Sequence, residues 1–215
     1  MKNEDRKSMG RTRKGVVIPV PPTATELPLG YDSFFIEVKQ KIQSERLRSI
    51  FSANAALVFL YWDIGSAILK KQASEGWGAK VIDRLSADLV VAFPEMSGFS
   101  ARNLKYMRKF AEVWSDRTIV QEVLAQIPWY HNITLLEKCS NTKTRLWYAA
   151  KAREFGWSRN ILAIQIESRL IDRKGQAVTN FDVALPLDTS DMAVQIFKDP
   201  YLFDFLGTDA PRREV

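Results

Sequence analysis

The stretch from Tyr31 to about Ser74 constrains the fold more than any other part of the sequence. It runs for 44 residues without a proline, and Gly65 is its only glycine. Its apolar residues, such as Phe35 and Val38, recur mostly at steps of three or four, which is the period of an α-helix. We therefore expect one very long helix or two collinear helices. At ~1.5 Å per residue this element would span ~65 Å, so its N-terminal part should kink or pack on another chain.

The composition of the 215-residue chain is that of a globular protein, with 46% hydrophobic and 26% charged residues. This share of apolar residues can bury a core, which excludes wholesale disorder. The single cysteine, Cys139, and the single histidine, His131, exclude a disulfide framework and a zinc finger. No glycine-rich phosphate loop occurs. We predict no metal site and no cofactor.

Neither an export signal nor a membrane-spanning segment is recognisable in the sequence. The longest apolar run, Ala55 to Trp62, has eight residues, against the ~20 that a spanning helix needs. A lone thiol also fits a reducing compartment. The sequence thus favours a cytoplasmic protein without a membrane partner.

Prolines, charges and apolar residues divide the chain into three regions. Residues 1–30 hold four prolines and mixed charges without apolar periodicity, and we expect a disordered basic arm. Residues 31–175 predict a helical domain. Residues 176–215 contain Pro186 and, apart from a short helix at 191–197, are expected to form a linker.

Helix start and stop signals divide the central domain further. A helix is expected from about 79 to 93, and a turn at 94–99 follows it. Ser100 then supplies an N-cap oxygen for a helix from 101 to about 114, so residues 79–114 have the outline of a helix-turn-helix. Further helices are expected at 118–126, 128–139, 142–155 and 159–173. Because no stretch shows sustained strand alternation, the predicted fold class is all-α, or mainly α.

The expected helix at 101–114 has an apolar face and a cationic face. On a helical wheel Leu104, Met107, Ala111 and Trp114 share one side, and the exposed arc carries Arg102, Lys105, Arg108 and Lys109. Cations in a first helical turn oppose the helix macrodipole by ~0.3–1 kcal/mol each. A phosphate backbone at that end would reverse the sign, because it neutralises both the side chains and the unpaired N–H groups.

This face therefore predicts a DNA-binding site. In helix-turn-helix docking the start of the second helix meets base edges, so Arg102, Asn103 and Lys105 are the candidates to read bases or position phosphates. Arg108 and Lys109 are candidate backbone contacts, and the N-cap residue Ser100 completes the predicted set. The interpretation requires cations that protrude without being paired to the protein's own carboxylates.

Other readings of these residues remain open. The cations could be a merely solvated face, and Asn103 and Tyr106 border the apolar arc, where packing or capping roles are favoured. The net charge of +6, from 31 basic and 25 acidic residues, decides little, because residues 1–30 contribute +3 of it.

We predict no catalytic residue in this chain. The string Glu37-Val38-Lys39 matches part of a PD-(D/E)XK nuclease signature, but it lies in a helical pattern, where residues two apart point to different faces. His131 lacks a plausible activated serine or cysteine partner and is expected to be structural.

Several ordered motifs resemble the N-terminal domain of the YhcG family. They are Leu60–Gly65 (LYWDIG), Trp77-Gly78 with Asp83–Leu89, Gly98–Arg108 (GFSARNLKYMR), Ile127–Asn132 (IPWYHN), Gly156–Leu162 (GWSRNIL), Gln165-Ile166, Thr179–Phe181 and Lys198–Gly207 (KDPYLFDFLG). The resemblance runs from about residue 31 to the end, and Tyr130 departs from the small residue expected between the Trp and His of its motif.

The resemblance implies a helical, winged-helix-like domain, with a minor β wing as an expected addition, that precedes a C-terminal PD-(D/E)XK nuclease domain. That nuclease domain, with its catalytic residues, is expected to be absent from this chain. A weaker resemblance is to the DNA-binding domain of ParB proteins, since Ser100–Trp114, His131–Leu136 and Ser158–Ile166 fall in the order of its helices. This likeness supports the placement of the helix-turn-helix independently of charge.

The leading hypothesis is a non-catalytic domain that binds double-stranded DNA through the helix at 101–114 and targets it for a YhcG-like nuclease. The alternative is a protein-interaction module that forms a homodimer through the long helix at 31–74. Binding of structured RNA is a third, weaker hypothesis. The sequence does not specify the DNA sequence recognised or the biological pathway.

Overall fold

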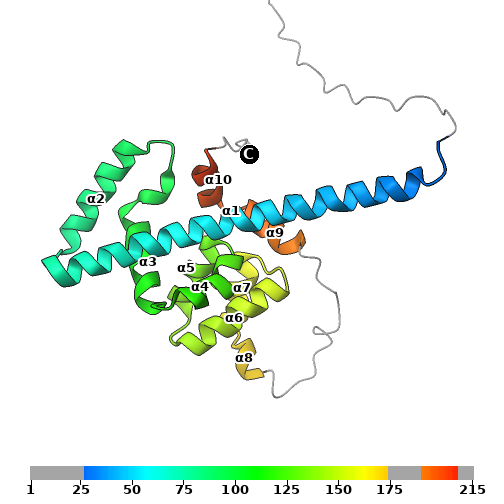
Figure 1. Ribbon diagram of the computed structural model, residues 1–215. Helices are drawn as coiled ribbons and strands as arrows, with labels where there is room; N and C mark the ends of the chain where they lie inside the picture. The colour runs from blue at the N-terminus through cyan, green and yellow to red at the C-terminus, as the bar shows by residue number, and fades with distance from the viewer. Residues whose placement is uncertain (1–26, 174–189, 208–215) are drawn as a thin grey trace, which may run out of the picture. The chain divides into compact units, whose positions relative to one another are not determined.

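The computed structural model describes residues 27–173 and 190–207, and every regular element in these residues is helical (Figure 1). The elements are α1 (Tyr31–Glu75), α2 (Ala79–Ala92), η1 (Ser97–Phe99), α3 (Ala101–Val113), α4 (Arg117–Glu122), η2 (Leu124–Gln126), α5 (Trp129–Lys138), α6 (Thr142–Glu154), α7 (Arg159–Glu167), α8 (Leu170–Arg173), α9 (Ser190–Phe197) and α10 (Pro200–Leu206). The all-α prediction is confirmed. The described residues contain no strand, so the expected β wing is not found among them.

The chain divides into two compact units, Met1–Gln40 and Lys41–Val215. The described part of the first unit is a short turn and the first ten residues of α1. The second unit holds the hydrophobic core. The predicted arm falls mostly on residues 1–26, outside the described residues.

Helix α1 supplies the core with one face of its second half. Its buried residues Asn54, Leu57, Val58, Tyr61, Gly65 and Ile68 recur mostly at three- and four-residue steps. Gly65 is needed because a Cβ there would lie 2.0 Å from the carbonyl oxygen of Met107, which shows how closely α1 and α3 approach. By length and mean hydropathy α1 could also cross a membrane, but buried core helices meet the same criterion.

Aromatic side chains from several elements meet at Trp129, the first residue of α5. Trp129 is fully buried, and its ring lies edge-on to Tyr61 at 5.0 Å and to Phe110 at 5.1 Å between centroids. Helices α1, α3 and α5 are therefore held around one indole.

The described C-terminal residues form two helices that contribute to the core. Within the expected linker, α9 corresponds to the short helix predicted at 191–197, whereas α10 was not predicted. Met192, Ile196 and Leu202 of these two helices are buried in the same core. The segment 198–207, which contains α10, has too few residues to show a clear helical period. The core residues on which it packs are also distant in the sequence. The predicted linker residues 176–189 and 208–215 lie outside the described residues.

Two predicted helices are also interrupted. The expected helix at 159–173 is divided into α7 and α8 at Arg169, whose φ of 50° is left-handed. The expected helix at 118–126 ends at Glu122 and continues as the 3-10 turn η2. Neither break is marked by glycine or proline, so local signals do not reveal it.

Candidate nucleic-acid interface

Helices α2 and α3 are joined by a structured turn. Gly98 and Phe99 of η1 are buried, and the Ser86 hydroxyl of α2 donates to the Phe99 carbonyl oxygen at 2.8 Å. Ser100 is the N-cap of α3, and its exposed side chain accepts a hydrogen bond from the Asn103 backbone N–H at 3.3 Å. These contacts fix the direction in which α3 leaves the turn.

Asn103 was expected to read bases or position phosphates, and the structure corrects this. Its side chain is only 1% exposed, its amide donates to the Gly98 carbonyl oxygen at 2.6 Å, and its Oδ1 accepts from Trp129 Nε1–H at 2.8 Å. Asn103 therefore ties the turn to α5 and does not reach a ligand. The alternative capping or packing role is the correct one.

The cations of α3 also have partners within the protein. Arg102 lies 3.6 Å from a Glu137 oxygen, Lys105 lies 3.1 Å from Asp83, and Arg108 lies 3.1 Å from Glu112. The Lys109 amine donates to the Leu136 carbonyl oxygen at 3.3 Å. The requirement for cations without internal carboxylate partners is therefore not met by Arg102, Lys105 and Arg108. Four cations and three carboxylates leave this face only weakly positive.

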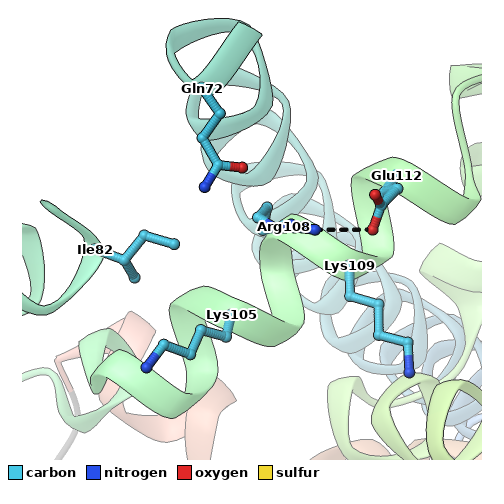
Figure 2. A pocket seen from close by; sticks show the side chains of 6 residues that line it. All are labelled: Gln72, Ile82, Lys105, Arg108, Lys109 and Glu112. Carbon is cyan, nitrogen blue, oxygen red and sulfur yellow. Dashed lines mark hydrogen bonds and ion pairs between the residues drawn. The ribbon is translucent and has the colours of Figure 1, made fainter. Parts of the chain in front are cut away.

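Three of these cations line a pocket of about 390 Å³ between α1, α2 and α3. Figure 2 shows Arg108 directed toward Glu112, while Lys105 and Lys109 extend away from each other. Gln72 and Ile82 complete its lining together with these side chains. The three cations thus do not converge on one anion.

The N-terminal ends of α3, α5, α7 and α10 come together at the first turn of α5. Asn103 near the start of α3 accepts from Trp129, and Asp199 before α10 accepts from the backbone N–H groups of Tyr130 at 3.2 Å and Tyr201 at 3.1 Å. His131 Nε2–H donates to the carbonyl oxygen of Trp157, just before α7, at 2.7 Å. Helix N-termini carry partial positive charge, and here the protein's own Asp199 carboxyl group caps the starts of α5 and α10.

A surface of arginines on tyrosine rings lies at these helix ends, and we call it the Arg–Tyr surface. It consists of Arg102, Tyr106, Tyr130, Arg159 and Tyr201. The Arg102 guanidinium lies 5.6 Å from the Tyr106 ring centroid, and that of Arg159 lies 4.8 Å from Tyr130. The Tyr130 and Tyr201 rings are 5.1 Å apart.

The two arginines of this surface are exposed, whereas its three tyrosines are half-buried. Tyr106 donates to a Glu137 carboxylate oxygen, and Arg102 in turn donates to the Tyr106 hydroxyl at 3.2 Å. Among the described residues no carboxylate lies within ion-pair distance of Arg159. Arg159 is thus the cation of this surface that remains most available to an anion.

Burial changes the ionisation of two groups beneath the Arg–Tyr surface. It raises the pKa of Asp199 to about 6, although the backbone N–H groups of Tyr130 and Tyr201 oppose this. Burial also lowers the pKa of His131 to about 4, so the imidazole is neutral at pH 7. His131 acts as a structural donor, as the sequence suggested.

Sequence reasoning missed Arg159, Tyr130 and Tyr201 as surface residues. Each of the three residues lies near the start of a helix, within a motif that carried the family resemblance. This shared position is the signal in the sequence that could have identified them. No group of three His, Cys, Asp or Glu residues that could hold a metal ion occurs in residues 27–173 and 190–207.

Comparisons with known proteins give the family. Residues 37–173 match the family described as the DUF1016 N-terminal domain. A relative from Escherichia coli (strain K12), named "Putative nuclease YhcG", is 23% identical in an alignment that covers 82% of this chain. The match covers 56% of the relative, so the chain corresponds to little more than half of that protein's length. No solved structure matches this chain.

Proposed function

The chain belongs to the DUF1016 N-terminal domain family, a nuclease-associated domain family, and we propose that its helical domain binds duplex DNA for a nuclease of the YhcG type. In this proposal the chain supplies recognition and no catalysis, and it acts in the cytoplasm. The DNA would lie against the start of α3 and the Arg–Tyr surface. Ser100, Arg102 and Lys105 remain proposed contacts from the sequence prediction, with Arg108 and Lys109 at the edge.

The observation that carries the proposal is the pair of exposed arginines held over tyrosine rings at the Arg–Tyr surface. A guanidinium held over a ring is pre-organised, so it loses less side-chain freedom when it binds a phosphate. Arginine side chains are also common phosphate ligands. The arrangement therefore offers the two guanidinium groups as phosphate donors on one surface.

The internal ion pairs of α3 do not prevent such binding. The Arg102 side chain is 81% exposed, and Lys105 and Asp83 are each about half exposed. Exposed ion pairs contribute only about 0–1 kcal/mol, so a phosphate can exchange for the carboxylate at little cost. Because these ion pairs reduce the positive potential around α3, we expect the affinity for duplex DNA to be moderate.

The first test removes the charges of the Arg–Tyr surface. Binding of a fluorescent DNA duplex is measured by anisotropy at low salt for the wild type and for the double variant Arg102→Gln/Arg159→Gln. We expect about a tenfold or greater loss of affinity, which corresponds to about 1.4 kcal/mol. Circular dichroism should show unchanged helical content, because both side chains are exposed.

A matched control and a variant of opposite sign sharpen this test. Arg48→Gln removes an arginine that is exposed to a similar degree, 79%, and should leave DNA affinity nearly unchanged. Glu137→Gln removes the carboxylate that holds Arg102 and Tyr106, and it should strengthen binding. Wild-type affinity in the double arginine variant would overturn the proposal.

Competition separates the polymers. Unlabelled duplex DNA should displace the probe more effectively than single-stranded DNA or structured RNA of equal length. Preferential displacement by RNA would replace the proposal with the weaker RNA-binding hypothesis.

A further inference from the structure

The first three turns of α1 expose an unusual number of apolar side chains. Tyr31, Phe34, Phe35, Ile36, Val38 and Ile42 are each between 37% and 64% exposed. At ~100° per residue, Tyr31, Phe35, Val38 and Ile42 fall within ~60° of one another on the helix. We call these four residues the α1 stripe.

The spacing of the α1 stripe is that of a coiled-coil seam. Its steps of four, three and four residues place Phe35 and Ile42 at a positions and Tyr31 and Val38 at d positions. The seam ends where the polar residues Glu45 and Ser49 occupy the next d and a positions. A seam of this kind pairs with another helix, because each apolar knob needs a facing hole.

We propose that the α1 stripe pairs two copies of this chain in antiparallel orientation. In that arrangement Phe35 faces Val38 of the second copy and Tyr31 faces Ile42. The same residues meet on both copies, as a twofold interface requires.

Charge complementarity selects a second copy and its orientation. Asp32 and Lys39 both occupy e positions, and antiparallel helices bring e positions of the two chains together, so that two Asp32–Lys39 pairs form across the interface. A parallel pair would instead place Lys41, at g, against Arg46, at e, and repel twice. On the other flank Phe34 would meet the aliphatic stem of Lys41.

The expected dimer is weak and concentration-dependent, because a pair of three-turn segments buries less area than stable interfaces do. Sedimentation velocity of the full chain without DNA, over a wide range of concentrations, measures it directly. Wild-type protein should shift from monomer to dimer as concentration rises. Phe35→Asp should remain monomeric, with unchanged circular dichroism, because Phe35 is exposed in the monomer.

A charge swap tests the orientation. Asp32→Lys and Lys39→Asp should each weaken the dimer at least several-fold, and the double swap should restore it, because the pairs form between copies. The two residues are seven apart and do not meet within one helix. Glu37→Lys makes the same change of charge at an outward-facing position and should have little effect. Absence of rescue in the double swap would overturn the antiparallel arrangement.

Two further outcomes would overturn the whole proposal. One is a wild-type chain that stays monomeric at all concentrations. The other is a monomer that floats with vesicles of phosphatidylethanolamine and phosphatidylglycerol in a manner that Phe35→Asp abolishes, which would assign the α1 stripe to a lipid surface. Both are independent of DNA binding, so failure here leaves the proposed function standing.

Discussion

At the scale of single residues, Gly65 is the described glycine at which an added Cβ would meet its nearest neighbour most closely. A Cβ at this site would collide with the Met107 carbonyl oxygen and lie 3.1 Å from the Ala111 Cβ. Backbone cannot move aside as a flexible side chain can. We expect Gly65→Ala to destabilise the fold by about 1–3 kcal/mol or more, measured by urea unfolding. Gly78→Ala, where a Cβ would meet nothing within 4 Å, should cost less than about 1 kcal/mol.

Two buried titratable residues contribute to the stability of the fold, and their contributions change with pH in opposite directions. His131 is protonated in the unfolded chain below pH 6.5 but only near pH 4 in the folded chain, so its contribution to stability is lost as pH falls from about 6.5 to 4. Asp199 has a raised pKa in the folded state, so its contribution is largest below pH 4 and is lost as pH rises toward 6. The two contributions oppose each other over the same range.

Asp199→Asn should therefore leave the pH dependence of stability that comes from His131 without its opposing contribution. The variant should lose stability between pH 6 and pH 4 more steeply than the wild type, by up to about 3 kcal/mol over that range for a pKa difference of about two units. Unfolding by urea at a series of pH values measures the difference. Parallel curves for the two proteins would show that Asp199 keeps an ordinary pKa in the fold.

At the scale of elements, α9 and α10 belong to the core and also hold the start of α5. Met192, Ile196 and Leu202 are almost fully buried, and Asp199 accepts hydrogen bonds from the first turn of α5. A chain that ends at Arg173 should therefore have a free energy of unfolding several kcal/mol lower than a chain that ends at Gly207, because three large apolar side chains lose their packing. The shorter chain should accordingly unfold at a lower urea concentration. Equal midpoints would show that α9 and α10 do not support the domain.

A helix cap offers a smaller effect at the same scale. Asn141 is the N-cap of α6, and its side chain accepts from the Thr144 backbone N–H at 2.8 Å. Asn141→Ala should cost about 1 kcal/mol, read as a lower thermal midpoint, while Asn141→Ser should retain most of the stability. A loss of equal size in both variants would contradict a capping role.

At the scale of the whole molecule, positive charge is divided between the N-terminal residues and the helical domain. Residues 1–26 hold six basic and three acidic residues, which is half of the net charge of +6. We expect their deletion to weaken DNA binding uniformly across sequences and to reduce its salt dependence, because fewer counterions are released. Anisotropy titrations at several salt concentrations measure this slope. The effect of Arg102→Gln/Arg159→Gln should persist in the shortened chain if the helical domain itself contacts DNA.

The sequence by itself determined the helical class, most helix boundaries and the N-cap of α3, Ser100. These features depend on apolar period and on hydrogen bonds that reach only three or four residues along the chain. The cationic face of α3 could be located in the same way, because its residues share one helix.

Only the tertiary structure decided which of those side chains are available to a ligand. Asn103 meets Trp129, Lys105 meets Asp83 and Asp199 meets Tyr130 across 26, 22 and 69 residues of sequence, respectively. Partners so far apart are chosen by the packing of helices on one another, which no local pattern encodes. For the same reason the Arg–Tyr surface, assembled from the starts of separate helices, became visible only in the folded chain.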